Sequence, residues 1–528
     1  MINAHAFAPL GKGETDAWEV LGNDGWNWDI LTKYLARVYT FPPVNTSVEE
    51  RLGIDGLAAR YGSCNGPLQL SFSGDPDHPV HQAWMETFRS NGHTSTSDPF
   101  LDPRGAFNCL ATIDPKTKER CSAAAAYYAP IQDRENLHVI TNATVEKILF
   151  EKISPEADPT VDSRAIGVQY RHNNETKIVT CRKEIIIASG ALQSPKLLEL
   201  SGIGNPELLE RHGIPLVQPL SGVGENLHDH LVCGIGFEAV DDLETLDALV
   251  RQEPEALQKA FQDYQERQTG LLTSIGLYTY AYLPPVGSRI GKVPGQDRVE
   301  KLLDQNRRPE GNSPAIVRAR AIHEVAKKTL LSHDQPSGVY FSVITQNVLP
   351  PGSHPDSPRA PIPGKFLTLG TMLSQPLSRG SVHITSSDVA GFPSLDPNYG
   401  SNPVDIEVMA QQLMYLESLA ATPSPLSNLF KKPLRRRDPA SESTSVDKAR
   451  AYVKSSAISM EHPGGTCAML PRDKDGVLDT QLRVYGTENI RVVDSSAMPL
   501  SNIANIQSTV YALAERAADL IKKTHGMQ

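Results

Sequence analysis

The 528-residue sequence contains few cysteines and no long apolar run. The six cysteines form no CxxC pair, and their number is too small for a disulfide framework. No apolar run approaches the roughly 18 residues that span a bilayer. We therefore expect a globular chain without structural zinc and without a membrane-spanning helix. The cysteines are Cys64, Cys109, Cys121, Cys181, Cys233 and Cys467.

Positive charge is also in deficit, because 51 Lys and Arg stand against 61 Asp and Glu, giving a formal net charge of −10. This balance argues against nucleic acid as the main partner. The first residues lack the basic stretch and apolar core of a secretory signal. Three glycosylation sequons, at Asn45, Asn142 and Asn174, are no more than chance provides in a long chain. The compartment stays open between cytoplasm and secretion.

Three segments predict α/β structure from their apolar periodicity. Residues 136–150 contain two strand-like alternations around Asn142. Residues 185–188, Ile-Ile-Ile-Ala, predict a buried strand that is followed by a helix in residues 194–202. Residues 490–493 predict another strand, and residues 508–522 predict a helix with one apolar face.

The chain between these segments has a different character. Residues 347–364 are proline-rich and predict a loop, and residues 285–333 predict a surface excursion. A strand near residues 382–384 and a long helix from about Asp405 indicate a second sheet with helices. The expected fold class is α/β within a chain that is α+β overall. A nucleotide-type α/β layer is assembled from distant pieces, with another domain inserted between them.

The stretch MEHPGGTCAM, residues 460–469, is the most informative for chemistry. The proline and glycines after His462 predict a tight, bare turn that presents the imidazole in a cavity beside a flat ligand. Histidine is the natural acceptor of a hydroxyl proton near neutral pH. The alternative is a structural or surface histidine.

The stretch SNIANIQ, residues 501–507, stands at the entry to the last helix. Asn505 can hydrogen-bond a substrate oxygen, and the helix N-terminus behind it favours a ligand that becomes anionic, such as a reduced flavin ring. The alternative is an ordinary Asn cap.

Two further motifs follow strands or turns. GALQSPKLLELSGIG, residues 190–204, places small residues after a strand, where backbone can approach a ligand at the carboxyl edge of a sheet. VGENLHDH, residues 223–230, contains His228-x-His230, which suggests a metal site. No third ligand stands at a suitable spacing, so we expect no metal and favour capping and loop packing.

Together these four stretches resemble the glucose–methanol–choline (GMC) flavin oxidoreductases. GALQSPKLLELSGIG fits the second signature of that family, and VGENLHDH is similar to its VGxNLxDH segment. HPGGTCAM and residues 492–521 are similar to its catalytic C-terminus. The resemblance extends to DAWEVLGNDGWNWD, residues 16–29, and it is weakest over residues 235–365.

The resemblance also bears on where this sequence begins. Family members carry a GxGxxG turn and then a GGSS-x-[IVL]-N signature, and MINAHAF, residues 1–7, resembles the tail of that signature. No GxGxxG occurs in these 528 residues. We therefore expect a truncated FAD-binding domain that lacks its first βαβ unit. It would comprise residues 1–40, 134–232 and 455–528, with residues 41–133 and 233–454 forming a substrate domain on an antiparallel sheet and helices.

The resemblance implies FAD-dependent oxidation of an alcohol to an aldehyde or ketone. His462 would take the hydroxyl proton, Asn505 would orient the alcohol oxygen, and hydride would pass to flavin N5. Val145 would contact the adenine side through its backbone. Ile2 occupies the position at which some members tether the flavin, so the FAD would be noncovalent. The residues expected along the flavin are Asn3, Ala4, His5, Ala6, Ser495 and Gln507.

The implied partners are a small-molecule alcohol and an electron acceptor, either oxygen or another compound. Residues 271–285 are aromatic and either line the pocket or pack in the core. The nearest resemblance is to fungal members that act on aryl or medium-sized alcohols, some in secondary metabolism. Two alternatives stay open: an inactive remnant without flavin, and a GMC-fold hydroxynitrile lyase.

Overall fold

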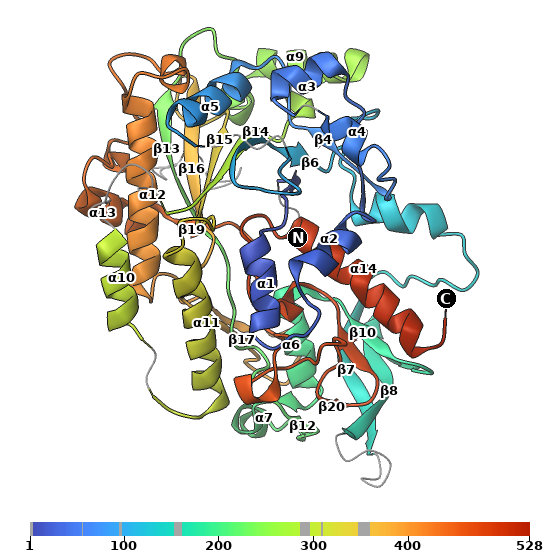
Figure 1. Cartoon of the computed structure of the whole chain (residues 1–528). Coiled ribbons are helices and arrows are strands. Elements are labelled where there is room, and N and C mark those ends of the chain that lie inside the picture. The colour runs from blue at the N-terminus through green and yellow to red at the C-terminus, as the bar shows by residue number, and fades with distance from the viewer. Residues whose placement is uncertain are drawn as a thin grey trace.

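A five-stranded antiparallel sheet and a parallel pair of strands organise the molecule, as the computed structural model shows (Figure 1). The residues described are 4–54, 56–93, 98–152, 161–285, 296–307, 310–346 and 360–527. Helices cover the large sheet on one side, and the C-terminal segment lies on its other side. This arrangement agrees with the expected α/β layer beside a second sheet with helices.

The large sheet has the order β14-β15-β16-β13-β19. Because successive side chains in a strand point to opposite faces, each strand supplies both sides. One face, with Leu367 and Leu369, packs on helix α12 (Pro403–Ala421). The other face, with Tyr280 and Phe341, packs on Ile503 of the C-terminal segment. The strands are β13 (Leu231–Glu238), β14 (Leu277–Leu283), β15 (Gly338–Val343), β16 (Phe366–Leu373) and β19 (Ile458–Ser459).

The parallel pair consists of β10 (Ile185–Ile187) and β21 (Ile490–Val492), as the sequence predicts. The predicted helices follow these strands, as α6 (Gly190–Leu200) and α14 (Gln507–Thr524). Asp494 joins the two units, because its carboxylate accepts hydrogen bonds from Gly190 N at 3.0 Å and from the Ser194 hydroxyl. The prediction of full burial is wrong for Ile186, which is 46% exposed.

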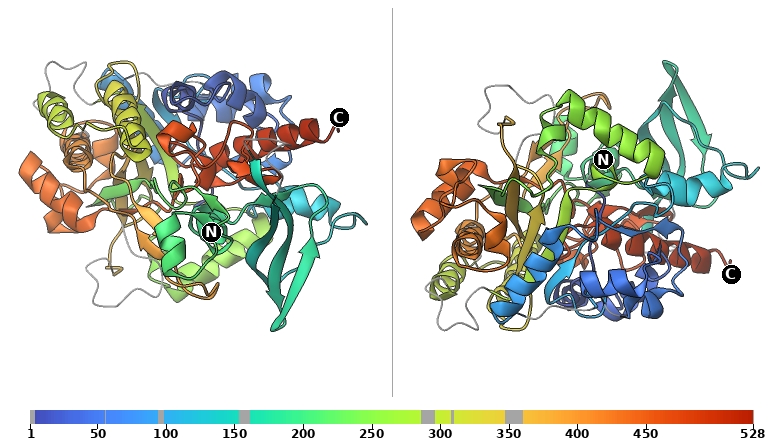
Figure 2. Two further views of the ribbon diagram at one scale, coloured as in Figure 1. Left: turned by 90° about the horizontal axis from the view of Figure 1, so that it is seen from below. Right: turned by 90° about the horizontal axis from the view of Figure 1, so that it is seen from above.

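A smaller sheet projects from the body in both views of Figure 2. Of the two strands expected within residues 136–150, only the second forms, and the first is wrong. Asn142 adopts a left-handed φ of 53°, which breaks the extended chain before β7 begins. Val139 and Ile140 are each 55% exposed and pair with no strand. The sheet contains β7 (Ala143–Lys152), β8 (Val161–His172), β9 (Glu175–Thr180) and β20 (Gly486–Thr487).

The segment expected as a surface excursion contains two helices, so that interpretation is wrong for much of it. The helices are α10 (Gln296–Gln305) and α11 (Pro314–Leu330). α11 buries Ile322 and Ala326 along one face. The amphipathic spacing of these residues outweighs the charged and turn-forming residues around them. Residues 286–295 and 308–309 lie outside the described residues, as do residues 347–359 of the expected proline-rich loop.

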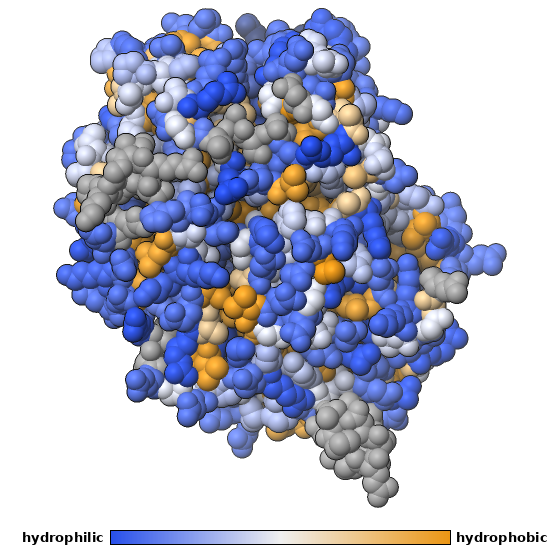
Figure 3. Space-filling model, viewed as in Figure 1, coloured by the Kyte–Doolittle hydropathy of each residue, from blue (hydrophilic) through white to orange (hydrophobic). Residues whose placement is uncertain are grey.

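The remaining expectations concern the surface and the cysteines. The strand expected near residue 382 is β17 (Ser381–His383), which pairs with β18 (Ser394–Asp396). All six cysteines are free thiols. Among the described residues, every helix is too short or too polar to cross a bilayer. Hydrophilic side chains cover most of the face seen in Figure 3, with hydrophobic ones in small patches.

A buried ion pair fastens β17 to α6. His383 Nδ1 lies 2.7 Å from Glu199 Oε1, and His383 Nε2 lies 3.3 Å from Glu225 Oε1. Glu199 is fully buried, and its second carboxylate oxygen accepts a hydrogen bond from Ile384 N. Hydrogen bonds to these two carboxylates raise the pKa of His383 to about 9. The imidazolium therefore stabilises the fold at neutral pH.

We expect the His383→Gln variant to lose stability in a pH-dependent way. The raised pKa means that the contribution of the ion pair is complete below about pH 6.5 and is lost as the pH rises through about 9. Urea titration should show a deficit of up to about 3 kcal/mol at pH 6 that shrinks toward pH 10. Exposed His138→Gln is the matched control. An equal deficit at both pH values would contradict the charged pair.

Candidate active site

Two histidines meet at the ends of paired strands. His230 immediately precedes β13, and His462 follows β19, while the antiparallel pairing of Leu231 with Ser459 brings the two strand ends together. The Nδ1 atoms of the two imidazoles lie 2.9 Å apart. Their rings are nearly perpendicular, at 89°. Strand pairing thus joins residues that are 232 positions apart in the sequence.

Asp229 anchors the loop that carries His462. One carboxylate oxygen accepts a hydrogen bond from the His462 backbone N at 2.8 Å. The other accepts from the hydroxyls of Ser459 and Tyr399. A carboxylate with three donors fixes the path of the loop and hence the direction of the imidazole.

The glycines after His462 make room for another side chain. A Cβ added at Gly464 or Gly465 would meet the ring of His228, so the bare turn lets His228 pack against it. The His228 ring is engaged by Met498 O at 3.2 Å and by the Ser501 hydroxyl at 2.8 Å. Within VGENLHDH, His228 therefore has the packing role that the sequence favours. No group of three or more potential metal ligands occurs within the described residues.

Asn505 stands directly beside His462. Its side-chain Nδ2 lies 3.2 Å from His462 Nε2, and its Oδ1 accepts a hydrogen bond from the Tyr280 hydroxyl. The alternative of an Asn cap is wrong, because the cap position of α14 is Ile506 and no side chain caps the helix. The structure therefore brings together the two residues predicted to be catalytic.

The network assigns the tautomer of each ring. His230 Nε2 faces the Asn502 carbonyl oxygen at 2.9 Å, and a carbonyl can only accept, so this nitrogen carries the proton. In the neutral ring His230 Nδ1 is then an acceptor, and His462 Nδ1–H donates to it. His462 Nε2 is consequently left with its lone pair, directed at the amide of Asn505. An imidazole nitrogen with a free lone pair can accept a proton.

Burial keeps both rings neutral. His462 is 3% exposed, and desolvation, followed by the repulsion that two charged rings would suffer, holds its pKa well below the usual value. Burial likewise lowers the pKa of His230 to about 4. At neutral pH the uncharged imidazole of His462 can therefore accept a proton.

Two buried polar atoms in residues around Thr112 have no hydrogen-bond partner. They are His5 Nδ1 and Gln507 Oε1. Both residues contact Thr112, whose N donates to His5 O at 2.9 Å and whose hydroxyl lies 3.5 Å from Gln507 Nε2. Buried polar groups are nearly always hydrogen-bonded, so this pair fits a ligand with ring heteroatoms, such as a flavin. His5 also has a left-handed φ of 63°, a strained conformation that is common at binding sites.

The other expected cofactor residues are dispersed. Ala4 precedes His5 and is exposed, while Ala6 lies in β1 (Ala6–Phe7). Ser495 accepts a hydrogen bond from Gly465 N at 3.1 Å, which places it on the His462 turn. Val145 belongs to β7, in a different sheet from the histidines. Asn3 lies outside the described residues.

Sequence reasoning missed His230, Asp229 and Tyr280 as parts of the site. The HDH triplet was interpreted as a packing motif, with a metal site as the alternative. Tyr280 belongs to the aromatic residues 271–285, for which both pocket lining and core packing were left open. One signal in the sequence could have indicated a site role for His230, since it directly precedes a strongly apolar segment. A side chain at that place lies at the end of a strand, where sites form.

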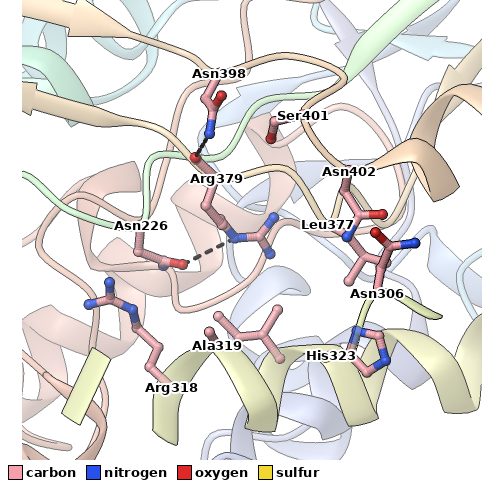
Figure 4. A pocket seen from close by; sticks show the side chains of 11 residues that line it. Asn226, Asn306, Arg318, Ala319, His323, Leu377, Arg379, Asn398, Ser401 and Asn402 are labelled. Carbon is pink, nitrogen blue, oxygen red and sulfur yellow. Dashed lines mark hydrogen bonds between the residues drawn. The ribbon is translucent and has the colours of Figure 1, made fainter. Parts of the chain in front are cut away.

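Another cavity has a lining that does not include His462. Its volume is about 360 Å³, and it is polar (Figure 4). Arg318 of α11 and Arg379 contribute positive charge, and Arg379 Nε donates to Asn226 Oδ1 at 3.1 Å. Asn226, which lines this cavity, belongs to the same loop as His228.

The sequence of this chain matches family models and known proteins. Family models described as GMC oxidoreductase match residues 1–232 and 376–514. GMC oxidoreductase family protein Mala s 12 of Malassezia sympodialis is 30% identical over 527 residues, which cover 98% of this chain and 78% of the relative. Dehydrogenase citC of Monascus ruber is 30% identical over 544 residues, with 99% and 82% covered.

Solved structures of other proteins have a similar fold. An FAD-dependent oxidoreductase from Chaetomium thermophilum superposes with a TM-score of 0.85 at 25% identity, covering 100% of this chain and 86% of the other. A fungal aryl-alcohol oxidase gives 0.81 at 25% identity, with 99% and 85% covered. The N-terminal model matches from residue 1, and the missing βαβ unit stays a prediction. The chain belongs to the GMC oxidoreductase family.

Proposed function

We propose that this chain oxidises an alcohol to an aldehyde or ketone with FAD, and that His462 is the base. The observation that carries the proposal is the unprotonated Nε2 of His462, which is buried and lies 3.2 Å from a side-chain amide donor. A hydroxyl group that lies beside this pair, against both nitrogens, can donate to Nε2 and accept from Asn505. The similarity to a fungal aryl-alcohol oxidase supports an alcohol as substrate.

The hydrogen bonds around His462 determine what the protein side chains do in this reaction. As the hydroxyl proton moves to His462 Nε2, the Asn505 amide stabilises the negative charge that develops on the oxygen. The new imidazolium keeps its Nδ1–H bond to His230, which remains anchored on the Asn502 carbonyl. A bound FAD supplies the acceptor for the hydride that leaves the carbinol carbon.

The cofactor assignment is part of the same proposal. His5 and Gln507 would satisfy their unpaired atoms on the flavin ring, with Asn3, Ala4, Ala6 and Ser495 around it and Val145 on the adenine side. The FAD is held noncovalently, because Ile2 offers no nucleophile. The division into an FAD-binding and a substrate domain, with the boundaries given above, and the choice between oxygen and another acceptor belong to this proposal as well.

Replacing the base should abolish the reaction while leaving the cofactor bound. We expect His462→Ala to lower the rate of anaerobic flavin reduction by alcohol about 10²- to 10⁴-fold, the usual contribution of general base catalysis. Stopped-flow absorbance with a panel of alcohols measures this rate. Asn505→Ala should cost less, because it removes a donor and leaves the proton acceptor in place. Retained flavin absorbance is the control, and an unchanged rate in His462→Ala would remove this residue from its role.

His230 is expected to act as a positioning residue. His230→Phe removes the acceptor for His462 Nδ1–H, so the ring loses its fixed tautomer and the reduction rate should fall about 10- to 100-fold. Nitrogen NMR of labelled histidines should show His462 protonated at Nδ1 in the parent chain and a tautomer mixture in the variant. His230→Gln, which restores an acceptor oxygen, should recover part of the rate. A normal tautomer in His230→Phe would refute the role.

A further inference from the structure

A second cavity, of about 190 Å³, lies on the face of the five-stranded sheet that turns toward Asn505. Cross-strand pairing sets its floor: Phe341 pairs with Gly370, and Gly370 pairs with Gly234. Its apolar lining comes from three strands of the sheet and from β19. The lining residues used here are Val232, Gly234, Phe341, Val343, Gly370 and Ile458.

Two glycines on neighbouring strands lie in the floor of this cavity. A Cβ at Gly370 would strike the ring of Phe341, and a Cβ at Gly234 would lie 3.1 Å from Thr368 Cγ2. Neither glycine has the positive φ that would require glycine for backbone reasons. The missing side chain of Gly370 therefore makes room for the Phe341 ring, and a side chain at Gly234 would crowd the floor of the cavity.

The cavity lies a short distance along the strands from the paired histidines. Val232 lies two residues after His230, and Ile458 lies four residues before His462, and these two residues pair with each other. Two residues of strand correspond to about 7 Å. On the other side, the Phe341 ring lies 6.2 Å from that of Tyr280, which donates to Asn505. A molecule with its hydroxyl at His462 can therefore reach the cavity with its far end.

The chemistry of the walls selects an apolar occupant. None of the lining residues is charged. The Thr368 hydroxyl is donated to Thr345 O at 2.7 Å, and the Thr345 hydroxyl is donated to Asp247 at 3.0 Å. The amide of Gln346 is likewise bonded to Asp247 and Ile362. With these polar groups already engaged, burial of apolar surface is the main gain that a ligand can make here.

We infer that this cavity binds the apolar arm of the substrate, and that Gly234, Phe341 and Val343 set the size of that arm. The inference rests on the proposed alcohol oxidation and specifies its substrate class as uncharged aryl or alkyl alcohols. The volume is below the roughly 300–1,000 Å³ of pockets for drug-sized ligands, so a single ring or a short alkyl chain is the matching size. Polyols, amino alcohols and hydroxy acids find no partner in it.

The test compares straight-chain primary alcohols from ethanol to hexanol, with benzyl alcohol, on the FAD-loaded chain. We expect kcat/KM to rise about fourfold per buried methylene. Val343→Phe fills the cavity from a half-buried position and should remove most of this rise. Gly234→Ala is a milder second variant with the same direction. Ile344→Val is the matched control, because Ile344 packs on the opposite face of the sheet.

A binding measurement separates this inference from the proposed function. The probe is 4-(trifluoromethyl)benzyl alcohol, followed by fluorine NMR line broadening on the parent chain and the variants. If no alcohol is oxidised but the probe binds and Val343→Phe abolishes binding, the cavity assignment stands and the reaction fails. If alcohols are oxidised with no dependence on chain length, or if Val343→Phe and Gly234→Ala leave both the rise and the probe binding intact, the cavity assignment is overturned.

Discussion

The hydrogen bond between the two imidazole Nδ1 atoms, at 2.9 Å, is the interaction on which the site depends. It forms only if one ring donates and the other accepts, and the Asn502 carbonyl decides which. The consequence appears at the far side of His462, where Nε2 is left as a buried lone pair beside Asn505. The Asn502 carbonyl, acting through the His230 ring, thus determines that His462 Nε2 is the atom that can accept a proton.

The fold supplies the geometry of this bond by pairing distant strands. β13 and β19 carry the two histidines at one end and the apolar cavity along their length. The same sheet turns its other face to α12, whose burial on nearly all sides anchors the strands. The proposed chemistry and substrate selection therefore lie on one face of the sheet, and the other face packs on helices.

The sequence was sufficient for the residues whose local pattern is distinctive. His462 and Asn505 stand in the HPGG and SNIANIQ stretches, and the helices after β10 and β21 follow from apolar periodicity. His230 and Tyr280 were not recognised, because each meets its partner in the site across more than 200 residues of sequence. Ile186 and the segment around Val139 were misjudged for a related reason, since an apolar residue is buried only where another element covers it.

The most direct test of a neutral, buried base is the pH dependence of anaerobic flavin reduction at saturating alcohol, between about pH 5 and pH 9. Burial holds the pKa of His462 well below 6.5, so the base is already unprotonated at neutral pH. We expect a rate that is constant from pH 7 upward and falls only toward acid. A rate that keeps rising through pH 8 would mean that His462 is charged in the resting site, and it would contradict the assignment of Nε2 as a ready acceptor.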